Sequence, residues 1–364
     1  MMKKLFSIFL LGAMASLPAF AQTSAKLTAT KANEFGLIYT LPLTAFEVTI
    51  AVEKTVSTPG EHYQYARKYL NADPIMKPAV AWRITDAVIN PIAIADEDQR
   101  YLANFKGGNG TFMMLTDSNF PLSVNDEDYD PDSQLTELPK AVAAEPTVLQ
   151  KPIAQQAITP EMIQSKSSAK RAELAAEKIY ELRTNRNEII SGQADAMPSD
   201  GAAMKLALDQ LSAQEEALTA MFLGTVQKSV EVRTYTVYVP DEGEAARTVV
   251  ARLSALDGLV APDDLSGDPI YAEITPVSRG ELPVNEKGVA KTFPKGGVAY
   301  RIPGSARVSL SYEGRTLAEK EFDVAQYGVV FGLDPALFTN KREPAYLHFN
   351  PLTGAVRELG TVGN

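Results

Sequence analysis

The stretch that decides the fold runs from Ser167 to Leu223 and reads SSAKRAELAAEKIYELRTNRNEII, then SGQADAMPSD, then GAAMKLALDQLSAQEEALTAMFL. Its first part (about Ser167 to Ile190) and its last part (about Gly201 to Leu223) place apolar side chains at steps of three and four. This spacing is typical of amphipathic helices. It predicts two long helices folded back as an αα-hairpin. The apolar residues are Ala172, Ala175, Ala176, Ile179, Leu182 and Ile189 in the first part, and Met204, Ala207, Leu208, Leu211, Leu218, Met221 and Phe222 in the second.

The segment between the two helices carries the residues that end one helix and begin the next. Gly192 can adopt the left-handed conformation that closes a helix. Ser199 or Asp200 can accept the free N–H groups at the start of the following helix.

Both sides of the hairpin are rich in strand patterns. Before it, Phe46, Val48, Ile50 and Val52 alternate with polar or small residues, which is typical of a strand with one buried face. After it, residues 230–239 (VEVRTYTVYV) begin a series of short strands separated by turns. We therefore predict an α+β fold in which two strand-rich, mostly antiparallel, sandwich-like domains are joined through the hairpin.

Five segments follow from these patterns. They are a signal peptide (1–21), an N-terminal strand-rich domain (22–124), an acidic, proline-rich linker (125–165), the helical hairpin (166–224) and a C-terminal β domain (225–364). The linker has prolines at 131, 139, 146, 152 and 160, and Tyr129 is its one aromatic residue. Such a sequence buries too little surface to offset its ordering entropy, so we expect it to be mobile.

The N-terminus has the pattern of a secretion signal. Lys3 and Lys4 precede an apolar run, and Ala19-Phe20-Ala21 forms a cleavage site before Gln22. No later apolar run approaches the roughly 18 residues that a membrane span needs. We therefore expect an exported chain in the periplasm or on the outer cell surface, not membrane-spanning after cleavage. The chain has no cysteine, so it must fold without disulfides.

The chain is acidic, with a formal net charge of −10. The signal holds two lysines and no acids, so the mature charge is −10 − 2 = −12. A nucleic acid or an anionic lipid would need a basic face, and this charge disfavours both as partners.

The acidic run in the linker has oxygen-bearing residues at the steps of a calcium-binding loop. Proline stands at the sixth position, where glycine makes the sharp turn, and the flanking sequence is not helical. A solvated acidic linker is therefore favoured over a calcium site, and no metal ligand is assigned. The six positions are Asp126, Asp128, Asp130, Asp132, Gln134 and Glu137.

The remaining candidates for chemistry have simpler explanations. His62 and His348 are isolated, outside any catalytic or zinc-binding pattern. Asp263, Asp264 and Asp268 could supply the carboxylate pair of a glycosidase. However, Asp-Asp-Leu-Ser-Gly also suits a turn, which is favoured.

The aromatic and glycine-rich segments also have simpler explanations. Tyr63, Tyr65, Tyr69 and Trp82 could form a platform for a sugar or peptide, but core packing is the simpler explanation. Gly107-Gly108-Asn109-Gly110 is followed by no helix, so we interpret it as a turn and not as a phosphate cradle.

Several segments together resemble a family of secreted envelope proteins of Gram-negative anaerobes, known only as a domain of unknown function. The resemblance covers nearly the whole mature chain. It implies full-length homology but no activity, cofactor or catalytic residue. The segments are Tyr63–Leu70, Met197–Gly201, Gln214–Leu218, Asp263–Tyr271, Tyr300–Gly304 and Phe349–Gly354.

Two functions remain open. The favoured hypothesis is an exported, non-catalytic binding or scaffold protein, with an envelope protein or glycan as partner and no cofactor. The alternative is a carboxylate-dependent hydrolase of envelope glycans. The hydrolase would need an open cleft where two acids converge, one of them with a raised pKa.

Overall fold

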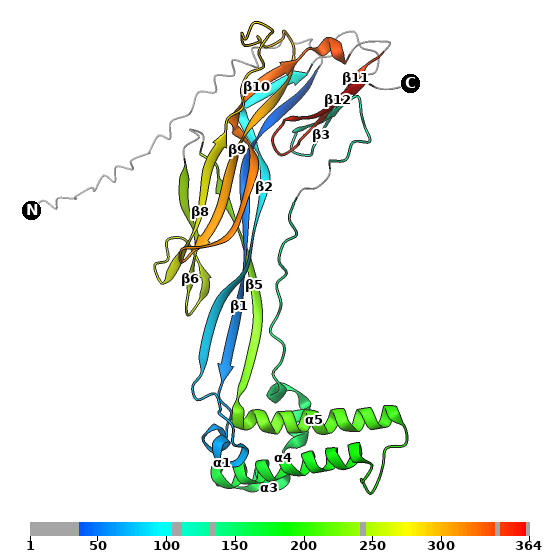
Figure 1. Ribbon diagram of the computed structural model, residues 1–364, viewed down its shortest axis with the longest axis vertical. Coiled ribbons are helices and arrows are strands. Elements are labelled where there is room, and N and C mark those ends of the chain that lie inside the picture. Colours follow the sequence, from blue (N-terminus) through cyan, green and yellow to red (C-terminus); the bar gives the residue numbers. More distant parts are fainter. Residues whose placement is uncertain (1–35, 104–110, 132–134, 241–244, 339–342, 362–364) are drawn as a thin grey trace, which may run out of the picture.

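The computed structural model describes residues 36–103, 111–131, 135–240, 245–338 and 343–361. The described chain is elongated, with helices at one end, strands along its length and a small sheet near the other end (Figure 1). Among these residues, no helix is long and apolar enough to cross a membrane. The fold is mixed α+β with antiparallel sheets.

One strand, β1 (Leu37–Thr58), forms the axis of the molecule (Figure 1). It pairs along nearly its whole length with β2 (Ala79–Ala103) on one side, and from Ala45 to Thr58 with β5 (Thr225–Tyr238) on the other, both antiparallel. At about 3.3 Å per residue, its 22 residues reach about 70 Å. The alternating residues of the sequence, Phe46, Val48, Ile50 and Val52, are all fully buried.

A five-stranded sheet, in the order β10-β9-β8-β6-β7, packs on the middle of this three-stranded sheet. Phe46 of β1 meets Phe322 of β10 with ring centroids 5.1 Å apart. The two inner faces share one core, so this part of the molecule is a sandwich. The strands are β6 (Ala246–Ser254), β7 (Gly258–Val260), β8 (Gly267–Ser278), β9 (Val298–Tyr312) and β10 (Arg315–Leu333).

A third sheet, in the order β12-β11-β4-β3, closes the end of the molecule opposite the helices (Figure 1). Its core includes Leu347 and Phe349 and the start of β1. The hydroxyl of Tyr39 on β1 accepts from the N–H of Ala299 (2.6 Å) on β9, which links the sheets. The strands are β3 (Met113–Leu115), β4 (Pro121–Val124), β11 (Ala345–Phe349) and β12 (Val356–Thr361), and the 3₁₀ helix η3 (Pro335–Leu337) follows β10.

The predicted αα-hairpin is confirmed, as α4 (Ser168–Ser191) and α5 (Gly201–Leu223). Gly192 ends α4 with φ +72°, and the side chain of Asp200 accepts from Ala203 N (2.8 Å) to open α5. Short helices cover the base of the pair. They are η1 (Tyr63–Tyr65), α1 (Ala66–Leu70), η2 (Val148–Gln150), α2 (Pro152–Ala157) and α3 (Pro160–Gln164).

The hairpin buries only the half nearest the sheets. Ile179 and Leu218 are fully buried there, whereas Ile189 and Met204, which belong to the same predicted faces, remain partly exposed. The outer half therefore projects from the frame as an arm (Figure 1). The base of the hairpin packs on the short helices.

The expected pair of separate strand-rich domains is not confirmed. β5, which follows the hairpin, pairs with β1, which precedes it. Likewise β11 from the C-terminal region pairs with β4 from the N-terminal region. Two of the sheets therefore combine strands from residues 22–124 and 225–364.

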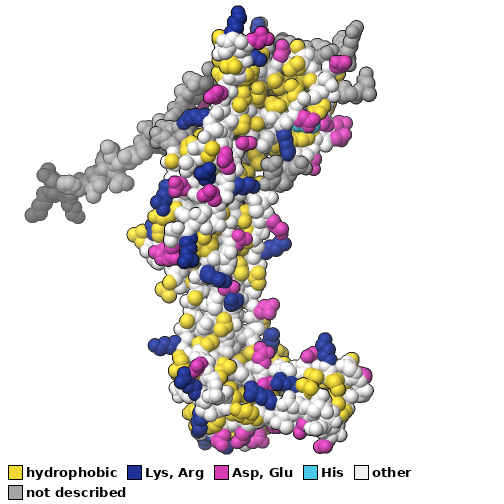
Figure 2. Space-filling model, in the orientation of Figure 1, with side chains coloured by type: hydrophobic (Ala, Val, Ile, Leu, Met, Phe, Trp, Pro, Cys, Tyr) yellow, Lys and Arg dark blue, Asp and Glu magenta, His cyan; other side chains and the backbone are white. Residues whose placement is uncertain are grey.

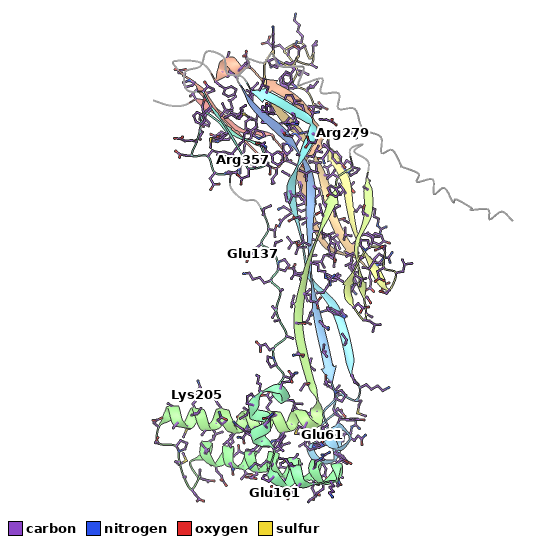
Figure 3. All side chains as sticks on the ribbon, turned by 180° about the vertical axis from the view of Figure 1, so that it is seen from behind. Glu61, Glu137, Glu161, Lys205, Arg279 and Arg357 are labelled. Atoms are coloured by element: carbon purple, nitrogen blue, oxygen red, sulfur yellow. The ribbon has the colours of Figure 1, made fainter. Side chains whose placement is uncertain are left out.

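Part of the linker is hydrogen-bonded to the sheet, whereas its composition predicts a mobile segment. We call residues 125–131 and 135–147 the strap. Asn90 of β2 donates to Thr136 O (2.9 Å) and accepts from Thr136 N (2.8 Å), and Val142 exchanges two backbone hydrogen bonds with Val230 of β5. The strap thus runs extended between the two ends of the molecule, with Glu137 along its course (Figure 3). Hydrogen bonds to the sheet replace the apolar burial that its sequence lacks.

Candidate functional site

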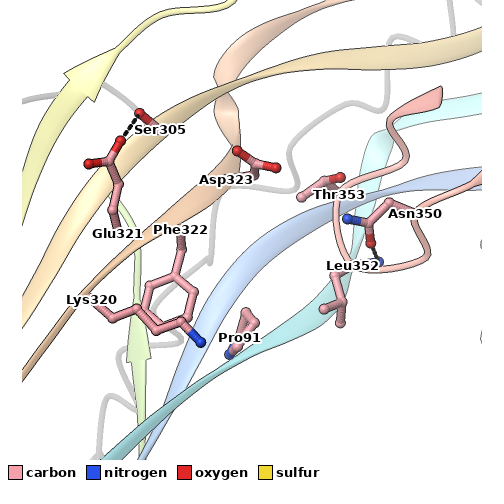
Figure 4. Close-up of a pocket in the computed structure, with 9 residues that line it drawn as sticks. All are labelled: Pro91, Ser305, Lys320, Glu321, Phe322, Asp323, Asn350, Leu352 and Thr353. Atoms are coloured by element: carbon pink, nitrogen blue, oxygen red, sulfur yellow. Dashed lines mark hydrogen bonds between the residues drawn. The ribbon is translucent and has the colours of Figure 1, made fainter. Parts of the chain in front are cut away.

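A hollow of about 380 Å³, lined by both polar and apolar side chains, lies between the outer strand β10 and the turn after β11 (Figure 4). Pro91 of β2 forms another part of its wall. We call this site the hollow. It is lined by Pro91, Ser305, Lys320, Glu321, Phe322, Asp323, Asn350, Leu352 and Thr353.

The turn Asn350–Gly354 is fixed by its own hydrogen bonds. The side-chain oxygen of Asn350 accepts from Leu352 N (3.0 Å), and its carbonyl accepts from Gly354 N (2.7 Å). Gly354 has φ +71°, and a Cβ there would lie 3.0 Å from Pro42 Cδ. The turn therefore needs glycine and presents Leu352 and Thr353 in one arrangement.

The hollow combines charged, polar and apolar groups. Ser305 Oγ donates to Glu321 Oε1 (2.9 Å), and the Lys320 ammonium lies 5.2 Å from the centre of the Phe322 ring. Asp323 projects between Glu321 and Thr353 (Figure 4). Carboxylates, an amide and hydroxyls beside apolar side chains can bind a ligand that has both hydrogen-bonding groups and an apolar face.

Buried interactions support the base of this turn. The backbone N–H of Arg301 on β9 donates to Gly354 O (2.9 Å). Its guanidinium, 6% exposed, pairs with Asp96 of β2 and donates to Ala325 O (3.3 Å). Burial lowers the pKa of Arg301. Two segments that carry the family resemblance, 300–304 and 349–354, thus lie side by side.

A second cluster surrounds His348 on β11. Its Nε2 lies 2.7 Å from Asp126 Oδ2 in the strap, and its Nδ1 lies 3.3 Å from Glu358 Oε2 on β12. The ring stacks on Tyr129 at 3.9 Å with an interplanar angle of 6°. A carboxylate faces each ring nitrogen, so neither nitrogen is placed to take a proton from a nucleophile.

The hydrogen bonds of this cluster shift the pKa values of its side chains. The bond from His348 is the main cause of the lowered pKa of Asp126. The hydroxyl of Tyr346 donates to Glu358 Oε1 (2.6 Å), which lowers the pKa of Glu358 and raises that of Tyr346. The cluster stabilises charged carboxylates and joins the strap to the third sheet, so we interpret it as a structural latch.

The three aspartates considered as a carboxylate pair are all exposed. Asp263 and Asp264 lie in the connection between β7 and β8, and Asp268 lies at the start of β8. Asp264 Oδ1 accepts from Ser266 N (2.9 Å), and hydrogen bonds from Ser266 lower the pKa of Asp264. The lowered pKa of Asp264 suits a turn and not a general acid.

Asp126 and Glu137, at the first and last of the calcium-loop positions, make contacts with other protein groups. Asp126 binds His348 and accepts from Asp128 N (3.0 Å), while Glu137 pairs with Lys140 (3.2 Å). Asp132 and Gln134 lie outside the described residues.

His62 lies in the helical core, 2% exposed, with its ring 5.4 Å from that of Phe222. Burial lowers the pKa of His62.

Tyr65 and Tyr69 pack against the same helical core, whereas Trp82 on β2 donates from Nε1 to Leu256 O (3.2 Å). Core packing, the favoured explanation, therefore holds for Tyr65 and Tyr69, and Trp82 lies in a different region. Residues 107–110 lie outside the described chain.

Sequence reasoning missed the hollow. Its walls come from β2, β9, β10 and the turn after β11, and no local pattern connects those elements. The one signal was the segment Phe349–Gly354, which carried part of the resemblance and forms one wall.

These features define an elongated α+β protein built on one long antiparallel strand, with a hollow of mixed polar and apolar lining beside a hydrogen-bonded turn. The chain belongs to the family described as "Domain of unknown function (DUF4831)", whose model matches residues 35–357. No curated protein and no solved structure matches the chain.

Proposed function

We propose that this is an exported, non-catalytic binding protein of the cell envelope that presents separated surfaces on a rigid frame. The observation that supports this most is β1, which is continuous for 22 residues, paired with β2 over nearly its whole length and with β5 from Ala45 to Thr58. A strand of this length fixes the spacing between the helical arm at one end and the third sheet at the other (Figure 1).

Two surfaces are suited to partners. The hollow offers mixed polar and apolar groups to an envelope protein or glycan. The arm exposes apolar side chains around its outer end, with Ile190 65%, Met197 44% and Leu206 63% exposed. Apolar side chains gathered at a projecting end favour an interaction surface.

The observations favour binding over hydrolysis. A glycosidase needs one carboxyl group with a raised pKa beside a second acid. Among the described residues, the carboxyl groups with a resolved shift all have lowered pKa values: Glu53, Asp126, Glu161, Asp264 and Glu358.

Site-specific photo-crosslinking in envelope extract tests the proposal. The crosslinker is placed at Leu352 in the hollow, at Leu206 on the arm, or at Leu256, an 80% exposed control between β6 and β7. We expect discrete products from Leu352 or Leu206 and only background from Leu256. Equal, diffuse products from all three positions would contradict a localised binding surface, and release of sugars from envelope glycans would favour the hydrolase.

A further inference from the structure

The connection between β8 and β9, residues 279–297, forms a projecting hairpin that the proposed function does not use. We call it the β8–β9 hairpin. Its tip is ordered by Asn285, whose side-chain oxygen accepts from Lys287 N (2.9 Å) and Val289 N (3.0 Å). Backbone bonds from Asn285 N to Val289 O (2.8 Å) and from Lys291 N to Pro283 O (2.7 Å) close it. The tip therefore has a fixed shape before it meets any partner.

The hairpin exposes apolar side chains that no described part of the chain covers. Leu282 is 40%, Val284 57% and Val289 59% exposed. Phe293, 44% exposed, holds the base of the hairpin against Phe331 of β10, with ring centroids 6.2 Å apart. This contact leaves Val284 and Val289 projecting at the tip.

The charge of the hairpin is opposite to that of the whole chain. Residues 279–297 hold Arg279 and three lysines against Glu281 and Glu286, so their net charge is 4 − 2 = +2, whereas the chain carries −10. None of the lysines, Lys287, Lys291 and Lys295, forms an ion pair within the described ranges. Charged and apolar side chains lie beside each other at this end of the molecule (Figure 2).

We propose that the β8–β9 hairpin docks the protein on an anionic lipid surface. Apolar side chains at an exposed tip can enter the boundary between headgroups and acyl chains, while nearby lysines are attracted to anionic headgroups. The negative charge of the whole chain disfavoured such a partner. However, screening limits each exposed charge to a range of about 8–10 Å at physiological salt, so the local charge decides at the tip.

Other exposed apolar side chains at the same end of the molecule support docking through the β8–β9 hairpin. Leu37 and Ile38 at the start of β1 and Leu337 in η3 are also exposed there, at 39%, 43% and 42%. The helical arm lies at the opposite end (Figure 1). Docking through the hairpin would hold the arm away from the lipid surface.

Vesicle co-sedimentation of the mature chain tests the proposal. The probes are vesicles of phosphatidylcholine alone and of phosphatidylcholine mixed with an equal amount of phosphatidylglycerol. We expect binding to the mixed vesicles that weakens with added salt. Each lysine near an anionic surface contributes roughly fivefold to the affinity. The double variant Lys287→Glu with Lys291→Glu should therefore weaken binding to the mixed vesicles by more than about fivefold. Val284→Asp with Val289→Asp should abolish it.

Control variants carry matched changes elsewhere. The first control is Lys205→Glu. Lys205 on α5 lies at the opposite end of the molecule from Arg279, which is at the base of the β8–β9 hairpin (Figure 3). The second control, Leu256→Asp, changes an exposed apolar residue outside the hairpin. Both should bind like the unchanged chain, and circular dichroism checks that all variants fold. No binding to anionic vesicles, or equal loss in the control variants, would overturn the proposal. Binding that needs the valines but not the anionic lipid would also overturn it.

Discussion

His348 Nε2 on β11 lies 2.7 Å from Asp126 Oδ2, where the strap leaves β4. These residues are far apart in the sequence. Asp126 is the first of the calcium-loop positions, and His348 belongs to no recognisable motif. Their contact, reinforced by the stacking of Tyr129 on the imidazole, fixes the upper end of the strap to the third sheet.

Asp126→Asn should release the start of the strap. Hydrogen exchange of residues 126–131 should become faster, with a loss of unfolding free energy under about 1 kcal/mol, because the pair is partly exposed. Asp128→Asn is the matched control and should leave exchange unchanged. Unaltered exchange in Asp126→Asn would show that the latch does not hold the strap.

The same contact predicts a pH dependence. The folded pKa of Asp126 lies below its ordinary value of 3.8. Its stabilisation is therefore present above the unfolded value and is lost as the pH falls through the folded pKa. Exchange of residues 126–131 in the unchanged chain should accelerate over that acidic range, and Asp126→Asn should show no such step.

Asp96→Asn should destabilise the frame strongly. It leaves the buried Arg301 guanidinium without its charged partner, which costs about 3–5 kcal/mol. Chemical unfolding measures the loss, and the exposed Asp98→Asn should change it by less than about 0.5 kcal/mol. An equal effect of the two substitutions would mean that the ion pair does not stabilise the fold.

Leu218→Ala should destabilise the helical end. Leu218 is fully buried, so its truncation should cost about 2–5 kcal/mol. The matched change Leu206→Ala, on the exposed side of the same helix, should cost under about 0.5 kcal/mol. Thermal unfolding with limited proteolysis across Ser167–Leu223 distinguishes them. Similar melting of both variants would show that the base of the hairpin has no tightly packed core.

His62 should make the helical end sensitive to acid. Burial, the main cause, and Arg171 lower its folded pKa below the ordinary 6.5, while Glu61 raises it. The unfolded chain therefore takes up a proton that the folded chain excludes, so stability falls as the pH drops below 6.5 toward the folded value. The free energy of unfolding of the unchanged chain should decrease relative to that of His62→Gln over this range. A constant difference between them would contradict the burial of a neutral His62.

The helices could be predicted closely from the sequence. The predicted first helix, about Ser167 to Ile190, differs by one residue at each end from α4, because spacing, Gly192 and Asp200 are local signals. Strand pairing could not be predicted in this way. Alternation shows which side chains of β1 are buried, but it does not identify β5 as a neighbour, and a helical hairpin separates the two strands in the chain.

The strap and the hollow were missed for the same reason. Thr136 and Asn90 have no pattern that announces their paired hydrogen bonds, and a polar linker favours mobility on composition alone. In the hollow, Asp323 and Thr353 come from different elements, β10 and the turn after β11, and both line the same pocket (Figure 4).

The rigid frame along β1 can be tested most directly by a distance measurement. The chain has no cysteine, so Ile38→Cys with Thr58→Cys gives one pair of spin labels at the two exposed ends of β1. Double electron–electron resonance should show one narrow distance distribution centred at about 65 Å, which is the length of 20 steps at roughly 3.3 Å each. The distribution should stay unchanged when a protease cuts between α4 and α5. A broad distribution, or a mean far below this length, would contradict a continuous frame.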